Sequence, residues 1–216
     1  PVQLGLLGFA NGVPTWVFML YAGVVADRVP RRRLLLITQT CMMVLAFVLA
    51  ALAFHHVVRP WHILLLAFGM GIANAFDAPT RLSFVSDLVG REHLTNAIAL
   101  NGAMFTTAVL IGPAIGGFIY NWLGPEWCFM INGLSFLAVI AALALMRIQE
   151  KPRQVKTTRT AADLLEGVKY CIKDRLTRNI VILQGTIGLF GFGMVSLLPA
   201  WAKDILGGDA STNGLL

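Results

Sequence analysis

Six long apolar runs constrain the fold of this chain more than any other feature. They are 18 to 26 residues long and cover Leu4–Ala26, Leu34–Phe54, Trp61–Ala78, Ala97–Trp122, Cys128–Met146 and Ile180–Trp201. A helix of about 20 residues crosses the hydrocarbon core of a bilayer. Charged residues make up only 13% of the chain, about half of their share in a soluble domain. The pattern predicts an all-α polytopic membrane protein and excludes an ordinary soluble globule.

The basic residues predict how these runs are oriented. Of the 17 Lys and Arg residues, fifteen lie in the alternate connections Asp27–Arg33, Arg81–His93 and Arg147–Arg178. Cytoplasmic loops of membrane proteins carry such an excess. We therefore expect these loops to face the cytoplasm of a bacterial inner membrane. The net charge of +6 is then explained by the orientation of the protein in the membrane. It is no longer an argument for nucleic-acid binding.

Three local patterns predict breaks or additional elements. Asn11-Gly-Val-Pro14 predicts an interruption of the first run, and the third apolar run ends near Ala78, before the polar stretch Ser83–Asn96. The charged segment before the sixth run predicts a basic linker and then one amphipathic surface helix. Its apolar residues recur every four positions and are Leu164, Val168, Ile172 and Leu176.

Polar residues inside the runs are candidates for a substrate cavity, because they are costly in a membrane and usually face a cavity or another helix. Asp77 and Arg81 are four residues apart and share a helix face. They form either a self-neutralising pair near the inner membrane edge or a substrate or proton site. For the others, hydrogen bonding between helices is an equal alternative. The candidates are Asn11, Asn74, Asp77, Arg81, Asn101 and Gln184.

Enzyme chemistry has no support in the sequence. The cysteines Cys41, Cys128 and Cys171 are far apart and form no metal-binding pair. No paired catalytic acids and no phosphate-binding loop are visible. We expect no catalytic residue, no metal and no cofactor. A membrane receptor or assembly protein stays open as a further alternative.

The turn after the first run carries the first family motif, Gly23-Val-Val-Ala-Asp27-Arg28-Val-Pro30-Arg31-Arg32. It resembles the G-x-x-x-D-R-x-G-R-R loop between helices 2 and 3 of the major facilitator superfamily. Pro30 replaces the usual glycine, so the tight turn must form differently. A generic basic stop at the membrane face is the alternative, but it does not require the acid. The matching residues are Gly23, Asp27, Arg28, Arg31 and Arg32.

The fourth run carries the second motif, Ala108-Val-Leu-Ile-Gly112-Pro113-Ala-Ile-Gly116-Gly117. It resembles the antiporter motif of helix 5 in the same superfamily, with Ala108 in place of its first glycine. Proline removes one backbone donor and kinks a helix. The motif indicates an exporter, and a packing kink without bearing on direction is the alternative.

Together the motifs imply a partial major facilitator fold, with about six of twelve transmembrane helices, numbered 2 to 7. The resemblance implies three parts: residues 1–146 as an N-terminal half without helix 1, residues 147–179 as a cytoplasmic linker, and residues 180–216 as the start of the C-terminal half. We expect the chain to be a piece of a longer protein. Residues 76–89 resemble the subgroup of bacterial enterobactin and macrolide exporters.

The family resemblance implies a secondary transporter that works by alternating access and exports small amphiphilic molecules against protons, with an importer of the same fold as the alternative. It implies a lipid bilayer, a small-molecule substrate and protons as partners, and a monomer. Asp27, Arg31 and Asp87 are expected to form a latch on the cytoplasmic side. The helix 4 motif R-x-x-Q-G of many drug antiporters has Leu65 and Phe68 at its arginine and glutamine positions. At this motif, therefore, no residue of this chain can take the proton-coupling role of that arginine.

Overall fold

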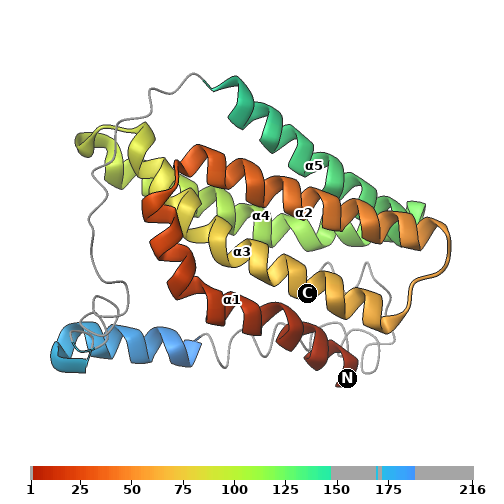
Figure 1. The fold of residues 1–216 in the computed structure, drawn as a ribbon, viewed down its shortest axis with the longest axis horizontal. Helices are drawn as coiled ribbons and strands as arrows, with labels where there is room; N and C mark the ends of the chain where they lie inside the picture. The colour runs from red at the N-terminus through yellow and green to blue at the C-terminus, as the bar shows by residue number, and fades with distance from the viewer. Residues whose placement is uncertain (1, 147–168, 170–171, 188–216) are drawn as a thin grey trace.

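The computed structural model describes residues 2–146, 169 and 172–187, and these are built from helices (Figure 1). This confirms the all-α class. A short 3-10 turn, η1 (Arg91–His93), precedes the fourth helix. The labelled helices are α1 (Val2–Arg28), α2 (Arg31–Phe54), α3 (Pro60–Leu88), α4 (Leu94–Leu123) and α5 (Pro125–Leu145).

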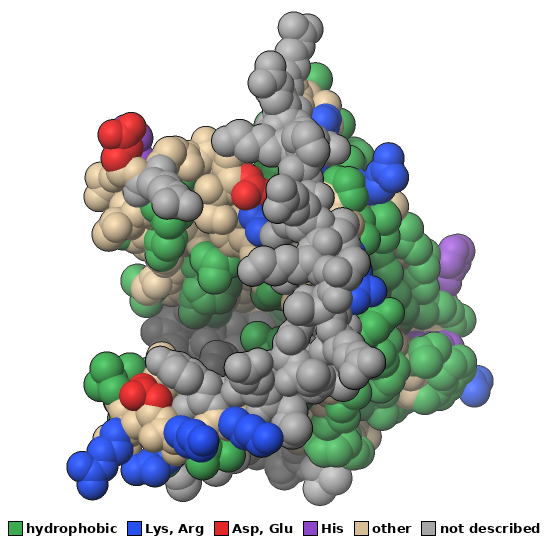
Figure 2. Space-filling model, turned by 60° about the vertical axis from the view of Figure 1, so that its left-hand side comes forward, with side chains coloured by type: hydrophobic (Ala, Val, Ile, Leu, Met, Phe, Trp, Pro, Cys, Tyr) green, Lys and Arg blue, Asp and Glu red, His purple; other side chains and the backbone are tan. Residues whose placement is uncertain are grey.

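Helices α2 to α5 are each long and apolar enough to cross a membrane. Helix α1 has 27 residues, a length of about 40 Å. In the described part of the chain, however, only α2 to α5 meet the criteria of both length and apolar composition for a membrane span. Large apolar side chains such as Trp16, Leu110 and Trp122 are exposed, and the right-hand side of Figure 2 shows a broad apolar surface. Such a surface suits lipid better than water.

The helices pack as a layered bundle in which α1 lies along α3, and α2 lies between α3 and α5 (Figure 1). Helix α4 contacts mainly α5, and Gly117 is its buried residue. Helix α2 buries a stripe at helical spacing. Its members are Leu34, Leu35, Thr38, Gln39, Met42, Ala46, Ala50 and Ala53.

Helix α1 runs unbroken through Pro14, so the predicted interruption at residues 11–14 is wrong. Pro14 is buried, and the next residue ties this turn to α3. The Thr15 hydroxyl lies 2.9 Å from the Asn11 carbonyl oxygen and 3.0 Å from the Gly71 carbonyl oxygen. The carbonyl that Pro14 leaves without an amide donor is that of Ala10, and the contacts of Thr15 instead join this turn of α1 to α3.

The close contact between α1 and α3 depends on Gly71. A Cβ atom at this position would collide with the Asn11 backbone carbonyl. Since lipid supplies no hydrophobic drive between helices, small residues that admit close packing contribute much of the association energy. The edge-to-face contact of Tyr21 and Phe76, with ring centroids 6.3 Å apart, extends the same contact.

Helix α3 continues ten residues past the end of the third apolar run at Ala78, through Pro79 to Leu88. The expected polar stretch at residues 83–96 is therefore largely helical, with α4 beginning at Leu94. The physical reason is that the extra turns are packed: Thr80 and Phe84 are buried against the bundle. As a result Asp77, Arg81 and Asp87 lie on one continuous helix.

The turn between α1 and α2 explains why proline replaces the family's glycine. Pro30 caps the start of α2 with φ of −53° and ψ of 120°. This φ is close to the value that the proline ring imposes. The Val29 amide donates to the Val25 carbonyl oxygen at 2.9 Å, so α1 ends just before the proline. The turn needs no left-handed residue at position 30.

The predicted amphipathic helix is interrupted at Asp174. Residues 172–173 are helical, and a new helix covers residues 175–187, so Leu176 belongs to the helix that leads into the sixth run. The Asp174 carboxylate accepts hydrogen bonds from the Thr177 amide at 2.8 Å and the Thr177 hydroxyl, as helix-capping residues do. These bonds lower the pKa of Asp174. Leu164, Val168 and residues 188–201 of the sixth run lie outside the described residues.

Replacing Gly71 by valine should separate α1 from α3 and destabilise the protein. We expect a loss of about 1–3 kcal/mol, the usual range for overpacking a tight contact. The measurement is the thermal unfolding of the full-length protein in detergent. Gly102→Val is the matched control, because a Cβ atom at residue 102 of α4 meets nothing within 4 Å. Equal melting temperatures for the two variants would contradict the proposed close contact.

Candidate functional site

Arg31 joins the start of α2 to the end of α3. Its Nη1 lies 2.6 Å from Asp87 Oδ1 and also donates to the Ser83 carbonyl oxygen. The Arg31 side chain is 12% exposed and that of Asp87 is 55% exposed. The ion pair therefore lies at the edge of the bundle, where the predicted cytoplasmic ends of the helices meet. Two members of the expected latch are brought together.

Arg32 joins the same end of α2 to the end of α5. Its Nε donates to the Leu143 carbonyl oxygen and its Nη2 to the Ala144 carbonyl oxygen, both at 2.8 Å. The last carbonyls of a helix have no partner within the helix, and a cation there also complements the helix dipole. The two consecutive arginines thus bind α2 to two different helices.

The other residues of the loop motif lie in the last turns of α1. Gly23 is half-buried and has open space where a Cβ atom would stand. Arg28 is exposed. Asp27 occupies the last turn of α1, and its side chain lies outside the described part of the structure. Its membership of the latch stays a prediction.

Asp77 is buried between α2 and α3, with 1% of its side chain exposed. Its Oδ1 accepts hydrogen bonds from the Thr38 hydroxyl at 2.9 Å and from Gln39 Nε2 at 2.8 Å. Its Oδ2 forms an ion pair with Arg81, whose side chain is 51% exposed. The pairing of Asp77 with Arg81 follows the predicted spacing. Its function stays a prediction.

Thr38 and Gln39, the two α2 partners of Asp77, are not among the site residues predicted from the sequence. Together with Thr40 they form a polar group in an otherwise apolar run. Polar residues within spans usually have a partner in another helix, so this signal was available. The sequence alone does not show which turn of α2 lies beside Asp77 of α3.

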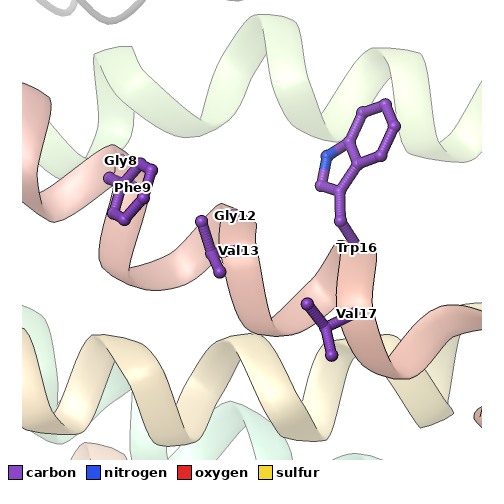
Figure 3. Close-up of a pocket in the computed structure, with 6 residues that line it drawn as sticks. All are labelled: Gly8, Phe9, Gly12, Val13, Trp16 and Val17. Carbon is purple, nitrogen blue, oxygen red and sulfur yellow. The ribbon is translucent and has the colours of Figure 1, made fainter.

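The remaining cavity candidates lie on four different helices. Asn11, Asn74 and Asn101 are half-buried, and Gln184 is exposed on the helix of residues 175–187. The described hollow lies elsewhere, on one face of α1, and has a volume of about 450 Å³. Figure 3 shows its six lining residues, all on this helix, with the Trp16 indole projecting from it. They are Gly8, Phe9, Gly12, Val13, Trp16 and Val17.

The antiporter-like motif lies on α4, which runs unbroken through Pro113. Gly117 is buried and Gly116 is half-buried. Gly112 and Gly116 have nothing within 4 Å of the position of an added Cβ atom. The motif therefore leaves room for a further side chain or helix at Gly112 and Gly116, whereas Gly117 is packed within the described part of the chain.

The whole chain matches one family model. Residues 1–216 match the model described as a transmembrane secretion effector, one of the MFS families. This agrees with the expected superfamily, which is one of transporters rather than enzymes.

Several characterised proteins are similar to the chain. A staphyloferrin A transporter of Staphylococcus aureus is 25% identical over 99% of this chain and 54% of its own length. An enterobactin exporter of Escherichia coli is 26% identical over 94% and 48% of the two chains. A macrolide efflux protein A of Streptococcus pyogenes is 22% identical over 94% and 50%. The chain thus spans about half the length of the curated relatives it matches.

The Arg31–Asp87 ion pair should contribute measurably but modestly to stability. Since Asp87 is half-exposed, we expect a coupling free energy of about 0.5–1 kcal/mol. A double-mutant cycle with Arg31→Gln, Asp87→Asn and the double variant isolates the pairwise contribution. The measurement is thermal unfolding of the full-length protein in detergent. Additive losses in this cycle would mean that the two side chains do not interact.

Arg32 should not be replaceable by lysine. Lysine keeps the positive charge but cannot place two donors on the Leu143 and Ala144 carbonyls in a fixed geometry. We expect Arg32→Lys to lose about 1–2 kcal/mol, as for one lost hydrogen bond from a charged group. The neighbouring exposed Arg33 offers the control Arg33→Lys. The hypothesis fails if both lysine variants unfold at the wild-type temperature.

Proposed function

Because the chain belongs to the MFS family of transmembrane secretion effectors, we propose that the complete protein exports small amphiphilic molecules across a bacterial membrane by proton-driven alternating access. The names of its relatives support the substrate class, since they include a staphyloferrin A transporter, an enterobactin exporter and macrolide efflux proteins. Siderophores and macrolides share a size and an amphiphilic character that suit an apolar cavity with a few polar groups.

The observation that carries this proposal is the joining of three helices at one end of the bundle. Arg31 binds α3 through Asp87 and Ser83, and Arg32 binds α5 through two backbone carbonyls. In alternating access, one side of the transporter must be closed while the other opens. Charged hydrogen bonds at the water-facing edge suit such a closure, because water can replace them when the helices separate.

The proposed latch holds the cytoplasmic side closed while the opposite side is open. Asp27 joins it from the end of α1, as in the family motif. Opening toward the cytoplasm then requires these contacts to break together. The orientation follows from the fifteen basic residues of the alternate connections, which the positive-inside rule assigns to the cytoplasm.

Two glycine surfaces support movement against further helices of the complete protein. One surrounds Gly8 and Gly12 on α1, and the other surrounds Gly112 and Gly116 on α4. Glycine in a membrane helix lets a second helix approach closely. Rocking of two halves against each other requires smooth, closely packed surfaces of this kind. An exporter and an importer both need such surfaces, and the resemblance of residues 112–117 to the antiporter motif is what favours the exporter.

Transport by the full-length protein in everted membrane vesicles tests the proposal, with enterobactin and a macrolide as probes. An exporter should accumulate a probe inside these vesicles and collapse an imposed proton gradient as it does so. Accumulation of the probes by intact cells instead, with no uptake into everted vesicles, would establish the importer. Accumulation without any effect on the proton gradient would refute proton coupling while retaining export.

The Asp27→Asn variant tests the latch in the same vesicles. Loss of one charge from a partly buried cluster is strongly unfavourable for the closed state, so we expect a shift toward the inward-open conformation and slower transport. The matched control is Arg33→Gln, which removes an exposed charge from the same loop. Normal transport by Asp27→Asn at equal expression would rule out its role in the latch.

A further inference from the structure

We propose that Asp77 and Gln39 form a proton-binding site between α2 and α3, in which proton uptake by the carboxylate turns the Gln39 amide and releases Arg81. The inference deepens the proposed proton-driven transport and rests on it, because it names a carrier for the proton. The proposal is based on the hydrogen bonds that the buried Asp77 carboxylate makes and on one acceptor beside it that makes none.

Asp77 is the acid that the structure buries deep inside a span. It lies eleven residues before the end of α3, about 16 Å along the helix axis. Of the other acids with described side chains in the five helices, Asp87 lies at the inner end of α3 and Glu126 in the first turn of α5. An ionisable group within a span is expensive and is a functional candidate once its partner is known.

The ionised state leaves one buried group unsatisfied. Gln39 donates through Nε2 to Asp77 Oδ1 at 2.8 Å, while its own carbonyl oxygen, Oε1, is buried and has no hydrogen-bond partner. A buried acceptor without a donor is destabilising, because it has lost its hydrogen bonds to water. Turning the amide cannot help while Asp77 is ionised, because a carboxylate has no proton to donate.

The neutral state gives this oxygen a donor, while Gln39 Nε2 gives up Asp77 as its acceptor. A proton bound at Asp77 Oδ1 makes that atom a donor, and the turned Gln39 amide can then offer Oε1 as its acceptor. Thr38 also has a second partner ready, since its hydroxyl lies 3.0 Å from the Leu35 carbonyl oxygen as well as 2.9 Å from Asp77 Oδ1. The two α2 residues can therefore serve both protonation states.

Proton uptake changes the charge of the cluster and thereby Arg81. Before uptake, the Asp77 carboxylate and the Arg81 guanidinium neutralise each other. After uptake, no proton or charge leaves, and the cluster carries the single positive charge of Arg81. A positive charge without a counterion is unfavourable inside a membrane. Because the half-exposed Arg81 side chain then carries an unpaired positive charge, a shift of this part of α3 toward water becomes favourable.

The surrounding charges leave Arg81 as the charged partner of Asp77. On α2, Arg31 is bound to Asp87, and Arg32 to α5. Helix α1 brings Tyr21 against the neighbouring Phe76 and carries Asp27 and Arg28 at its end. Helix α4 contains no charged residue.

Infrared difference spectroscopy of the purified full-length protein between alkaline and acidic buffers tests proton binding without any substrate. We expect a C=O stretching band of a protonated carboxyl group in a non-aqueous site. The double variant Asp77→Asn/Arg81→Gln, which keeps the site neutral overall, should lack the band. Glu126→Gln is the control and should retain it. If the double variant does not purify as a folded protein, Asp77→Glu serves instead and must shift the band.

The role of Gln39 has its own measurement in the same spectra. Gln39→Leu removes the acceptor of the new O–H group and should shift the band to higher frequency. Thr38→Val removes a donor to the carboxylate but leaves this acceptor, so the band should stay near its wild-type position. A band that persists in the double variant, or one that is indifferent to Gln39→Leu, overturns the proposal.

Everted vesicles distinguish this inference from the proposed function. With a macrolide or enterobactin as the probe, the double variant should exchange the probe down its gradient without moving protons. Proton movement that persists in the double variant refutes the role of Asp77 and leaves the transporter proposal intact. If the wild type moves the probe but no protons, proton-driven export fails, and the infrared band alone still decides whether Asp77 binds a proton.

Discussion

The bundle depends on the need to neutralise the Asp77 carboxylate inside a membrane span. Hydrocarbon offers no water to hydrogen-bond a polar group, so partners must come from the protein. Asp77 obtains them from its own helix through Arg81 and from α2 through Thr38 and Gln39. A slide of one turn between the two helices would separate these groups. One carboxylate therefore sets the register of α2 against α3.

The two ends of the bundle are held by different forces. Away from the arginines, small residues allow close packing: Gly71 admits the α1 backbone, and Gly133 leaves room for the Phe47 ring, which a Cβ atom would approach to 2.5 Å. At the arginine end, Arg31 and Arg32 hold α2 through charged hydrogen bonds. Packed contacts of this kind do not exchange with water, whereas exposed ion pairs do. Reversible opening is therefore favoured at the arginine end.

The sequence predicted those parts of the fold that depend on local spacing. Apolar run length located the helices, and a spacing of four residues placed Arg81 on Asp77. The family motif brought Arg31 to Asp87, although the two are far apart in the chain. The contacts of Arg32 with the end of α5 and of Gln39 with Asp77 could not be predicted, because they depend on how separate helices align. The error at Pro14 has the same origin: packing against a neighbouring helix keeps a segment helical that the local sequence marks as a break.

Two buried side-chain atoms lack a hydrogen-bond partner among the described residues, and both lie on α2 opposite an acid of α3. They are Arg31 Nε and Gln39 Oε1, whose side chains bind Asp87 and Asp77. A contact that served stability alone would be expected to satisfy such atoms, because an unpaired polar group is more costly in a low-dielectric interior. Unused donor and acceptor capacity instead allows the same residues to exchange partners. The α2–α3 contact is therefore the part of this bundle best suited to have two states.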